Sequence, residues 1–264
     1  PEHIREAFHE GIEKGYKEFH LTSEDASAYG EDLGISLPDL LESILSLKGE
    51  FKLRVGMMNP LHFLKKENEL QKLINVYRDP KIFKFLHLCV QSGSDRVLKG
   101  MMRGYTIEDF RKIIETFRKE IPKITIWTDI ITGFPGESEE DFEETLQLIR
   151  EMKFDSINIS KYAVRLGTKA AKMIQISSEV MKERRGKFGL LGKEESKKKN
   201  EAWIGWVGEV FIDEYKLNKK SFIGRNFAYK PVVLHDQLKL GMSVKVKIID
   251  AKETHLVGKI IDQD

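Results

Sequence analysis

Cysteine is almost absent from this sequence of 264 residues. Cys89 is the only one, so the chain can form no intrachain disulfide and cannot by itself supply the several thiolates of a metal or iron–sulfur site. Cys89 lies within the apolar run at 83–90, which is typical of a buried strand. We therefore expect its side chain to be a small part of the core, and we predict no metal site in this chain.

Long apolar runs and an excess of one charge are also missing. No apolar stretch approaches the roughly 20 residues that a membrane span needs, and residues 1–5 lack the basic-then-apolar order of a signal peptide. Lys and Arg number 44 against 42 for Asp and Glu, so any basic, nucleic-acid-binding face must be local. We expect a cytoplasmic protein without membrane attachment.

Helical and strand-like periods alternate over the first two thirds of the chain, a pattern that indicates repeated βα units and a parallel sheet. Such units close into a barrel or stack in a doubly wound sheet. We assign residues 1–168 to a partial parallel β/α barrel. Its strands are predicted at 19–22, 51–55, 85–90, 125–131 and 156–160, and its helices at 1–16, 37–47, 60–77, 107–119 and 138–152.

The last third of the sequence has two segments that differ in composition and periodicity from the first part. Residues 169–200 are rich in Lys and Arg and predict a bridging helix, which is either a solvated linker or a helix with one face on RNA phosphates. Residues 201–264 follow a period of two, with short strands at 203–211, 221–227, 232–234, 243–249 and 256–261. This pattern predicts a small all-β, antiparallel barrel of the oligonucleotide-binding type.

Polar and glycine-rich residues follow each predicted strand of the first part, where a β/α barrel carries its working residues. Each can be explained singly; for example, Ser138 with Asp141 forms a capping box, and Ser92 and Ser94 can cap a helix. Five such strand ends in succession predict a polar ring at one barrel mouth, suited to a small zwitterionic ligand with hydroxyls and an adenine. Glu24 can pair an amino group and Arg165 a carboxylate.

The sequences of these strand ends resemble the successive motifs of the radical S-adenosylmethionine methylthiotransferases. The matching runs are LTSED at 21–25, VQSGSDRVL at 90–98, MRGYT at 102–106, TDIITGFPGE at 128–137 and RLGTKAA at 165–171. The chain is most similar to the archaeal and eukaryotic branch. That branch methylthiolates N6-threonylcarbamoyladenosine beside the anticodon of tRNA.

The resemblance implies an enzyme with three parts: an amino-terminal methylthiotransferase domain, a radical barrel and a carboxyl-terminal TRAM module. It implies two 4Fe–4S clusters, an electron donor and a sulfur source in the full-length protein. The barrel's Cys-x-x-x-Cys-x-x-Cys motif has no match here, so we expect a chain that starts downstream of it and is inactive alone. Cysteine thiolates are the usual ligands of such clusters.

The same resemblance assigns S-adenosylmethionine to residues at the barrel mouth. Ser23 and Glu24 would lie near the methionyl amine, and Asp129 near the adenosyl group. Gln91 and Ser92 would lie near the ribose or sulfonium, and Arg165 near the methionyl carboxylate.

Residues 202–261 resemble a TRAM module, and residues 224–231 are its most informative part. Guanidinium, amide, aromatic and ammonium groups occur there within eight residues, a mixture that binds RNA loops. We predict that this segment contacts the anticodon arm of tRNA through Arg225, Asn226, Tyr229 and Lys230. The alternative is that Phe227 and Tyr229 fill the barrel core and Arg225 is solvated. Trp203 and Trp206 are expected in the core or at a domain interface.

Three functions fit these observations. The first is a tRNA methylthiotransferase lacking its cluster ligands, and the second is an RNA-binding protein without catalysis. The third is a β/α-barrel enzyme for phosphorylated metabolites, in which Gly133 to Gly136 would cradle a phosphate. The TRAM-like module has no obvious use in that third class.

Overall fold

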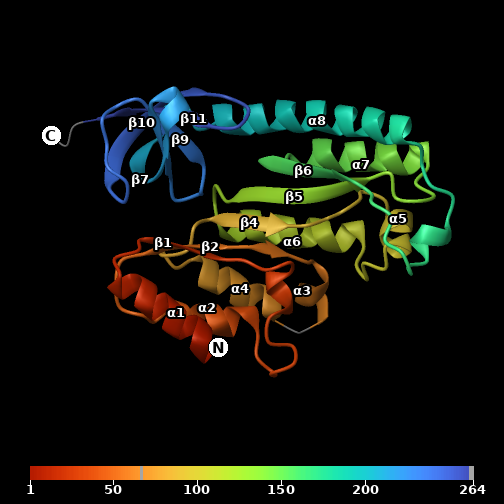
Figure 1. The fold of residues 1–264 in the computed structure, drawn as a ribbon, viewed down its shortest axis with the longest axis horizontal. Helices are drawn as coiled ribbons and strands as arrows, with labels where there is room; N and C mark the ends of the chain where they lie inside the picture. The colour runs from red at the N-terminus through yellow and green to blue at the C-terminus, as the bar shows by residue number, and fades with distance from the viewer. Residues whose placement is uncertain (66–67, 262–264) are drawn as a thin grey trace.

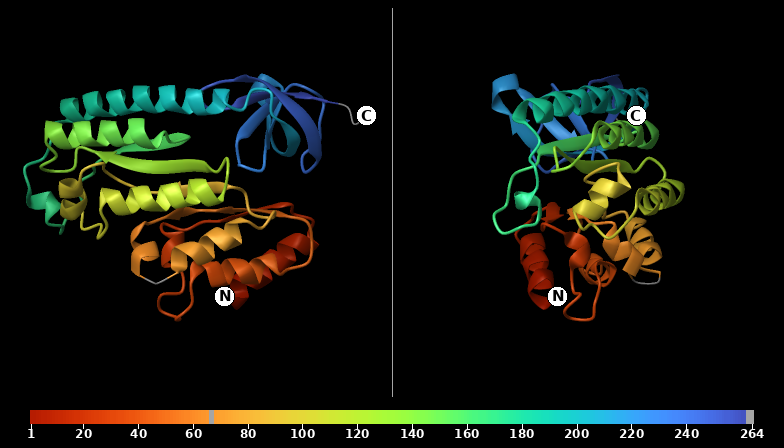
Figure 2. Two further views of the ribbon diagram at one scale, coloured as in Figure 1. Left: turned by 180° about the vertical axis from the view of Figure 1, so that it is seen from behind. Right: turned by 90° about the vertical axis from the view of Figure 1, so that its right-hand side faces the viewer.

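The computed structural model describes residues 1–65 and 68–261. They form an α/β part built on parallel strands and a small closed β-barrel (Figure 1). The long helix α8 (Ser178–Glu201) runs along the α/β part and carries the small barrel at its carboxyl end (Figures 1 and 2). No helix of the described residues has the length and apolarity that crossing a membrane requires.

The strands of the α/β part are all parallel, as the alternating pattern predicts. One sheet has the order β1-β2 and the other has the order β3-β4-β5-β6, so the predicted barrel of parallel strands is two open sheets. Only Gly56 separates β2 from β3; a Cβ there would lie 2.9 Å from the Leu21 carbonyl oxygen, so glycine lets the end of β1 come close. The strands are β1 (Glu18–Leu21), β2 (Lys52–Val55), β3 (Met57–Met58), β4 (Phe85–Leu88), β5 (Thr125–Thr132) and β6 (Ser156–Lys161).

Helices cover the outer face of these strands, and their apolar sides form one core with the sheets. The predicted helix over 60–77 is two helices, because Asn68 has the left-handed φ of 64° at the start of α4. The prediction also missed the short helix α5. The helices are α1 (Glu2–Glu13), α2 (Leu37–Leu45), α3 (Leu61–Lys65), α4 (Glu69–Tyr77), α5 (Asp95–Gly100), α6 (Ile107–Glu120) and α7 (Glu139–Met152).

The predicted capping box at the start of α7 is present. The Ser138 hydroxyl accepts from the Asp141 backbone N–H at 3.2 Å, and the Asp141 carboxylate accepts from the Ser138 N–H. Asp141 also accepts hydrogen bonds from Ser94 (2.7 Å) and Arg96. The Asp141 carboxylate therefore ties the start of α7 to the loop that follows β4, at the carboxyl edge of the larger sheet.

The small barrel has the five predicted strands in the closed order β10-β11-β9-β8-β7. Neighbouring strands are antiparallel except β9 and β11, which pair parallel. Alternate residues such as Val210, Ile212 and Val246 point inward, and Trp203 closes the core, as expected. The strands are β7 (Val207–Lys216), β8 (Ser221–Arg225), β9 (Pro231–Leu234), β10 (Ser243–Ala251) and β11 (Leu256–Ile260), with the short helix η3 (Leu217–Lys219).

The bridging helix is shorter than the basic segment that predicts it. Helix α8 begins at Ser178, where the Ser177 hydroxyl caps it. Residues 169–177 belong to the loop after β6 and contain only the short helix η2 (Ala170–Lys172). This leaves a largely exposed loop of sixteen residues, 162–177, at the carboxyl end of the last parallel strand.

Candidate active site

A cavity of about 850 Å³ opens at the carboxyl ends of β4, β5 and β6. The loops after these strands form its walls, so it occupies the position where parallel β/α folds bind their ligands. Its polar lining consists of Gln91, Arg103, Asp129, Asn158, Ser160, Lys161, Tyr162, Arg165, Thr168 and Lys169.

Asp129, on β5, is the only carboxylate among the residues that line this cavity. Its oxygens accept hydrogen bonds from His87 Nε2 (3.0 Å), Cys89 Sγ (3.1 Å) and Asn158 Nδ2 (2.7 Å). Burial raises the pKa of the Asp129 carboxyl, but the hydrogen bonds from His87, Cys89 and Asn158 outweigh burial and leave it below the ordinary value. Asp129 is therefore an oriented anion at neutral pH.

Gln91 enters the cavity through an uncommon backbone conformation. Its φ is 71°, a left-handed value that costs a non-glycine residue energy. Two backbone hydrogen bonds to β5 hold it there: Gln91 N–H donates to the Asp129 carbonyl (2.8 Å), and Ile131 N–H donates to the Gln91 carbonyl (2.9 Å). The strain is maintained where the side chain faces the cavity, which is typical of functional positions.

The loop after β5 is fixed by a buried ion pair from α8. Glu137 Oε2 accepts from the Gly133 N–H at 3.0 Å and from Arg184 Nη1 at 2.7 Å. Gly133 has a φ of 80°, and a Cβ there would lie 2.2 Å from Met181. Because the Gly133 N–H already donates to Glu137, this loop is not arranged as the phosphate cradle of the third hypothesis.

The structure brings together three of the six residues predicted for S-adenosylmethionine: Gln91, Asp129 and Arg165 line the cavity. Ser92 does not, because its hydroxyl is buried away from the cavity, where it accepts from the Ser94 N–H (3.2 Å) and contacts Thr145 Oγ1 (3.5 Å). The prediction that Ser92 binds a ligand is therefore corrected: its hydroxyl stabilises the loop after β4.

Ser23 and Glu24 are exposed at the end of β1 and lie outside this lining. The sequence interpretation missed Asn158 and Arg103. Alternation along β6 could have indicated Asn158, which shares an inward face with Ser160.

One group of side chains among the described residues could hold a metal ion. It consists of His87, Cys89 and Asp129, whose possible ligand atoms lie within 4.8 Å of one another. Its thiol is protonated, because burial and then the neighbouring Asp129 charge raise the pKa of Cys89. One neutral thiol does not fit a 4Fe–4S cluster, which needs several thiolates. As predicted, Cys89 is buried, and within 1–65 and 68–261 it is the single free cysteine.

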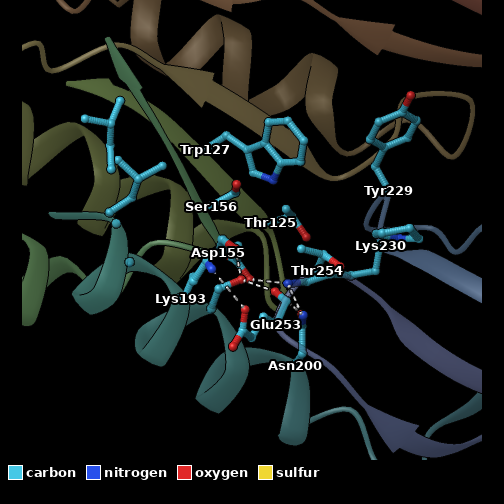
Figure 3. A pocket seen from close by; sticks show the side chains of 16 residues that line it. Thr125, Trp127, Asp155, Ser156, Lys193, Asn200, Tyr229, Lys230, Glu253 and Thr254 are labelled. Atoms are coloured by element: carbon cyan, nitrogen blue, oxygen red, sulfur yellow. Dashed lines mark hydrogen bonds and ion pairs between the residues drawn. The ribbon is translucent and has the colours of Figure 1, made fainter. Parts of the chain in front are cut away.

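The segment predicted to bind RNA lies largely at the boundary between the two parts of the molecule. Lys230 Nζ pairs with Asp155 Oδ1 at 2.7 Å and donates to Asn200 Oδ1 at 2.7 Å (Figure 3). Asn226 is completely buried, and its Oδ1 accepts from the backbone N–H groups of Ala228 and Lys230. Neither side chain is accessible to RNA in this conformation. The prediction that Asn226 and Lys230 contact RNA is therefore corrected: both are buried where the small barrel meets the α/β part.

Tyr229 and Arg225 take part in the same interface. The Tyr229 ring is 8% exposed and packs edge-on against Phe83 and Phe85 of the α/β part, with centroids 4.8 and 5.2 Å away. Arg225 is half-buried, pairs with Asp213 at 2.7 Å and lies over the Tyr229 ring. Neither hypothesis for this segment anticipated its contact with the α/β part.

Residues 1–149 of the chain match the family model described as the Radical SAM superfamily. The chain belongs to the radical SAM superfamily. In this superfamily context, the parallel strands and the cavity at their carboxyl ends are the expected scaffold and ligand site. A solved structure with a TM-score of 0.52 and 16% identity supports the fold: coproporphyrinogen III oxidase (HemN) from Escherichia coli, described as a radical SAM enzyme. That match covers 88% of this chain and 54% of HemN.

Curated relatives confirm the resemblance seen in the motifs. A probable threonylcarbamoyladenosine tRNA methylthiotransferase of Pyrococcus horikoshii is 42% identical over 95% of this chain and 58% of its own length. The threonylcarbamoyladenosine tRNA methylthiotransferase of Drosophila melanogaster is 39% identical over 100% of this chain and 47% of its own length. This radical SAM chain thus spans about half the length of the relatives it matches.

Proposed function

We propose that this chain forms the S-adenosylmethionine pocket and an RNA-binding module of a tRNA methylthiotransferase. The reaction would place a methylthio group on N6-threonylcarbamoyladenosine next to the anticodon, in the cytoplasm. One observation carries the proposal: the cavity at the carboxyl ends of β4 to β6 gathers Gln91, Asp129 and Arg165, from three of the motifs that resemble this family.

The cavity suits S-adenosylmethionine in size and in chemistry. A volume of about 850 Å³ falls in the range of small-molecule sites. The Arg165 guanidinium offers a two-pronged donor for the methionyl carboxylate, and the oriented Asp129 carboxylate offers an acceptor for a hydroxyl or amino group of the adenosyl part. Gln91 adds an amide to the same lining. Ser23 and Glu24 are proposed for the methionyl amine at the edge of β1.

The small closed barrel is proposed to be a TRAM module that binds the anticodon arm of tRNA. Its five strands and its place at the end of α8 agree with that role. Of the four residues predicted there, Arg225 keeps some exposure and Tyr229 is buried. Asn226 fixes the turn at 226–230, and Lys230 holds the module against the α/β part through Asp155.

Cluster chemistry would have to involve residues outside this chain. When bound, such a cluster supplies the electron that cleaves S-adenosylmethionine, and a second cluster supplies sulfur in the proposed full-length enzyme. A protein electron donor and a sulfur source would be its other partners. What this chain's own residues do is bind the cofactor, orient it and shield it.

Deleting the gene in its host tests the activity. Transfer RNA from the deleted strain should retain N6-threonylcarbamoyladenosine and lose its 2-methylthio derivative, as measured by mass spectrometry of digested nucleosides. Reintroducing the gene should restore the derivative. Unchanged nucleosides in the deleted strain would reject the function.

A further inference from the structure

Residues 161–176, which are the last residue of β6 and most of the loop after it, have an unusual charge composition. Between residues 156 and 178 the sequence contains four basic residues and no acidic one, although the whole chain is nearly neutral. The basic residues are Lys161, Arg165, Lys169 and Lys172, and all four are exposed. Within 1–65 and 68–261, no carboxylate lies within ion-pairing distance of any of them.

Three of these four cations line the cavity described above, and Arg103 lines it from the loop after α5. The Nε of Arg103 is buried and has no hydrogen-bond partner among the described residues. Asp129 is the only carboxylate in the lining. The methionyl carboxylate of one cofactor would pair one of these cations, so the mouth carries more positive charge than the cofactor needs.

Large apolar side chains are exposed beside these cations. Leu166 is 95% exposed and Ile174 is 92% exposed, both in the same loop, and Met102 is 80% exposed in the loop that carries Arg103. Met102 lines the cavity, and Leu166 and Ile174 belong to the loop that supplies Arg165 and Lys169 to it. Exposed apolar side chains gathered beside a cavity are typical of a binding surface. Single-stranded RNA loops are bound by cations that contact phosphates and by aromatic rings or guanidinium planes that stack on unpaired bases. The cavity lining offers both kinds of group, with Lys161 and Lys169 for phosphates and Tyr162 and Arg103 for stacking.

We infer that residues 161–176, together with Met102 and Arg103, form a rim that binds the single-stranded loop of the RNA substrate around the cofactor cavity. The rim and the small barrel lie at opposite ends of α8 (Figure 1). A helix of 24 residues is roughly 36 Å long. An RNA that contacts both must therefore be extended, as a stem with a loop is. This inference rests on the proposed function and assigns its substrate-binding residues.

The test measures binding of a tRNA anticodon-arm hairpin to the chain at several salt concentrations. The triple variant Lys161→Gln, Lys169→Gln, Lys172→Gln removes three cations of the rim. Lys48→Gln, Lys72→Gln, Lys119→Gln is the matched control, because these three lysines are also exposed and are absent from the lining of the cavity. All six side chains are on the surface, so neither variant should alter folding.

The rim variant should bind about tenfold more weakly or worse. The slope of log affinity against log salt should become shallower by about 2, since each phosphate contact to a single strand contributes roughly 0.7. The control should keep the wild-type slope. Leu166→Ser with Ile174→Ser should weaken binding without changing the slope, because no phosphate contact is lost.

Equal slopes for the rim variant and the control would overturn the rim while leaving RNA binding intact. Absence of hairpin binding by the wild-type chain would instead count against the proposed function itself. Competition by poly-glutamate as strong as that by the hairpin would identify an acidic protein surface as the partner and would also overturn the inference.

Discussion

Lys230 Nζ and Asp155 Oδ1 lie 2.7 Å apart across the boundary between the small barrel and the α/β part, with side chains 4% and 6% exposed. Further polar contacts cross the boundary beside this pair. Ser196 Oγ lies 2.7 Å from the Asp155 carbonyl oxygen and 2.6 Å from that of Glu253, and Asn200 donates to the Lys252 carbonyl. The small barrel is therefore held against the α/β part by direct contacts as well as by its connection to α8.

We expect Lys230→Met to destabilise the protein by roughly 3 to 5 kcal/mol, because it leaves the Asp155 charge buried without a partner. Asp155→Asn should cost less on the Lys230→Met background than alone. Urea unfolding of both single variants and the double variant checks this by a double-mutant cycle. If Lys230→Met unfolds like the wild type but binds tRNA weakly, Lys230 is an RNA ligand and the interface assignment is wrong.

Asp141 should make the protein sensitive to acid. Burial raises the pKa of the Asp141 carboxyl, but hydrogen bonds from Arg96, Ser138 and Ser94 outweigh burial and hold it well below its usual range. A lowered folded-state pKa gives stability that is present above the unfolded value, near pH 4, and is lost as the pH falls below it.

Asp141→Asn should therefore lower the free energy of unfolding at pH 7 by roughly 2 to 3 kcal/mol and flatten its decline between pH 5 and pH 2. Chemical denaturation at a series of pH values measures both effects. Asp236→Asn, at an exposed position, is the control. Parallel pH profiles for Asp141→Asn and the wild type would contradict this role.

Arg184 should stabilise the loop after β5 by neutralising Glu137. Burial already raises the pKa of Glu137, although hydrogen bonds from Gly133 and Arg184 oppose that effect. Arg184→Met should raise the pKa of Glu137 further and destabilise the protein by roughly 3 kcal/mol at pH 7. A raised folded-state pKa means stability that is full below the unfolded value, near pH 4, and lost as the pH rises through the folded value.

Adding Glu137→Gln to Arg184→Met should remove that loss at rising pH, because the amide carries no charge to bury. Denaturation of both variants between pH 4 and pH 8 checks the expectation. A loss of stability in the double variant that still grows with pH would mean that another group is responsible.

Sequence patterns predicted the strands well because each is a short apolar run bounded by turn residues, as at 125–131. Splitting of the 60–77 helix depends on one left-handed residue, Asn68, which periodicity does not reveal. Gln91, Asp129 and Arg165 could be grouped in advance because the carboxyl ends of parallel strands share an edge.

The segment at 224–231 was misjudged for a different reason. Local alternation says which face a side chain occupies, but the partner of Lys230 is Asp155, which is 75 residues earlier in the chain. Ser92 was likewise assigned to a ligand, although its hydroxyl faces Thr145 on α7. Tertiary contacts of this kind leave no periodic signal in the sequence.

The proposed function depends on the cavity around Asp129 being the cofactor site of a tRNA methylthiotransferase. It is tested most directly by complementing the gene deletion with Asp129→Asn, and with Asp236→Asn as control, and measuring 2-methylthio-N6-threonylcarbamoyladenosine in tRNA. At equal protein levels, Asp129→Asn should restore at least about tenfold less of the modified nucleoside, because it removes a charged acceptor from the cofactor site. Full restoration by Asp129→Asn would contradict the account.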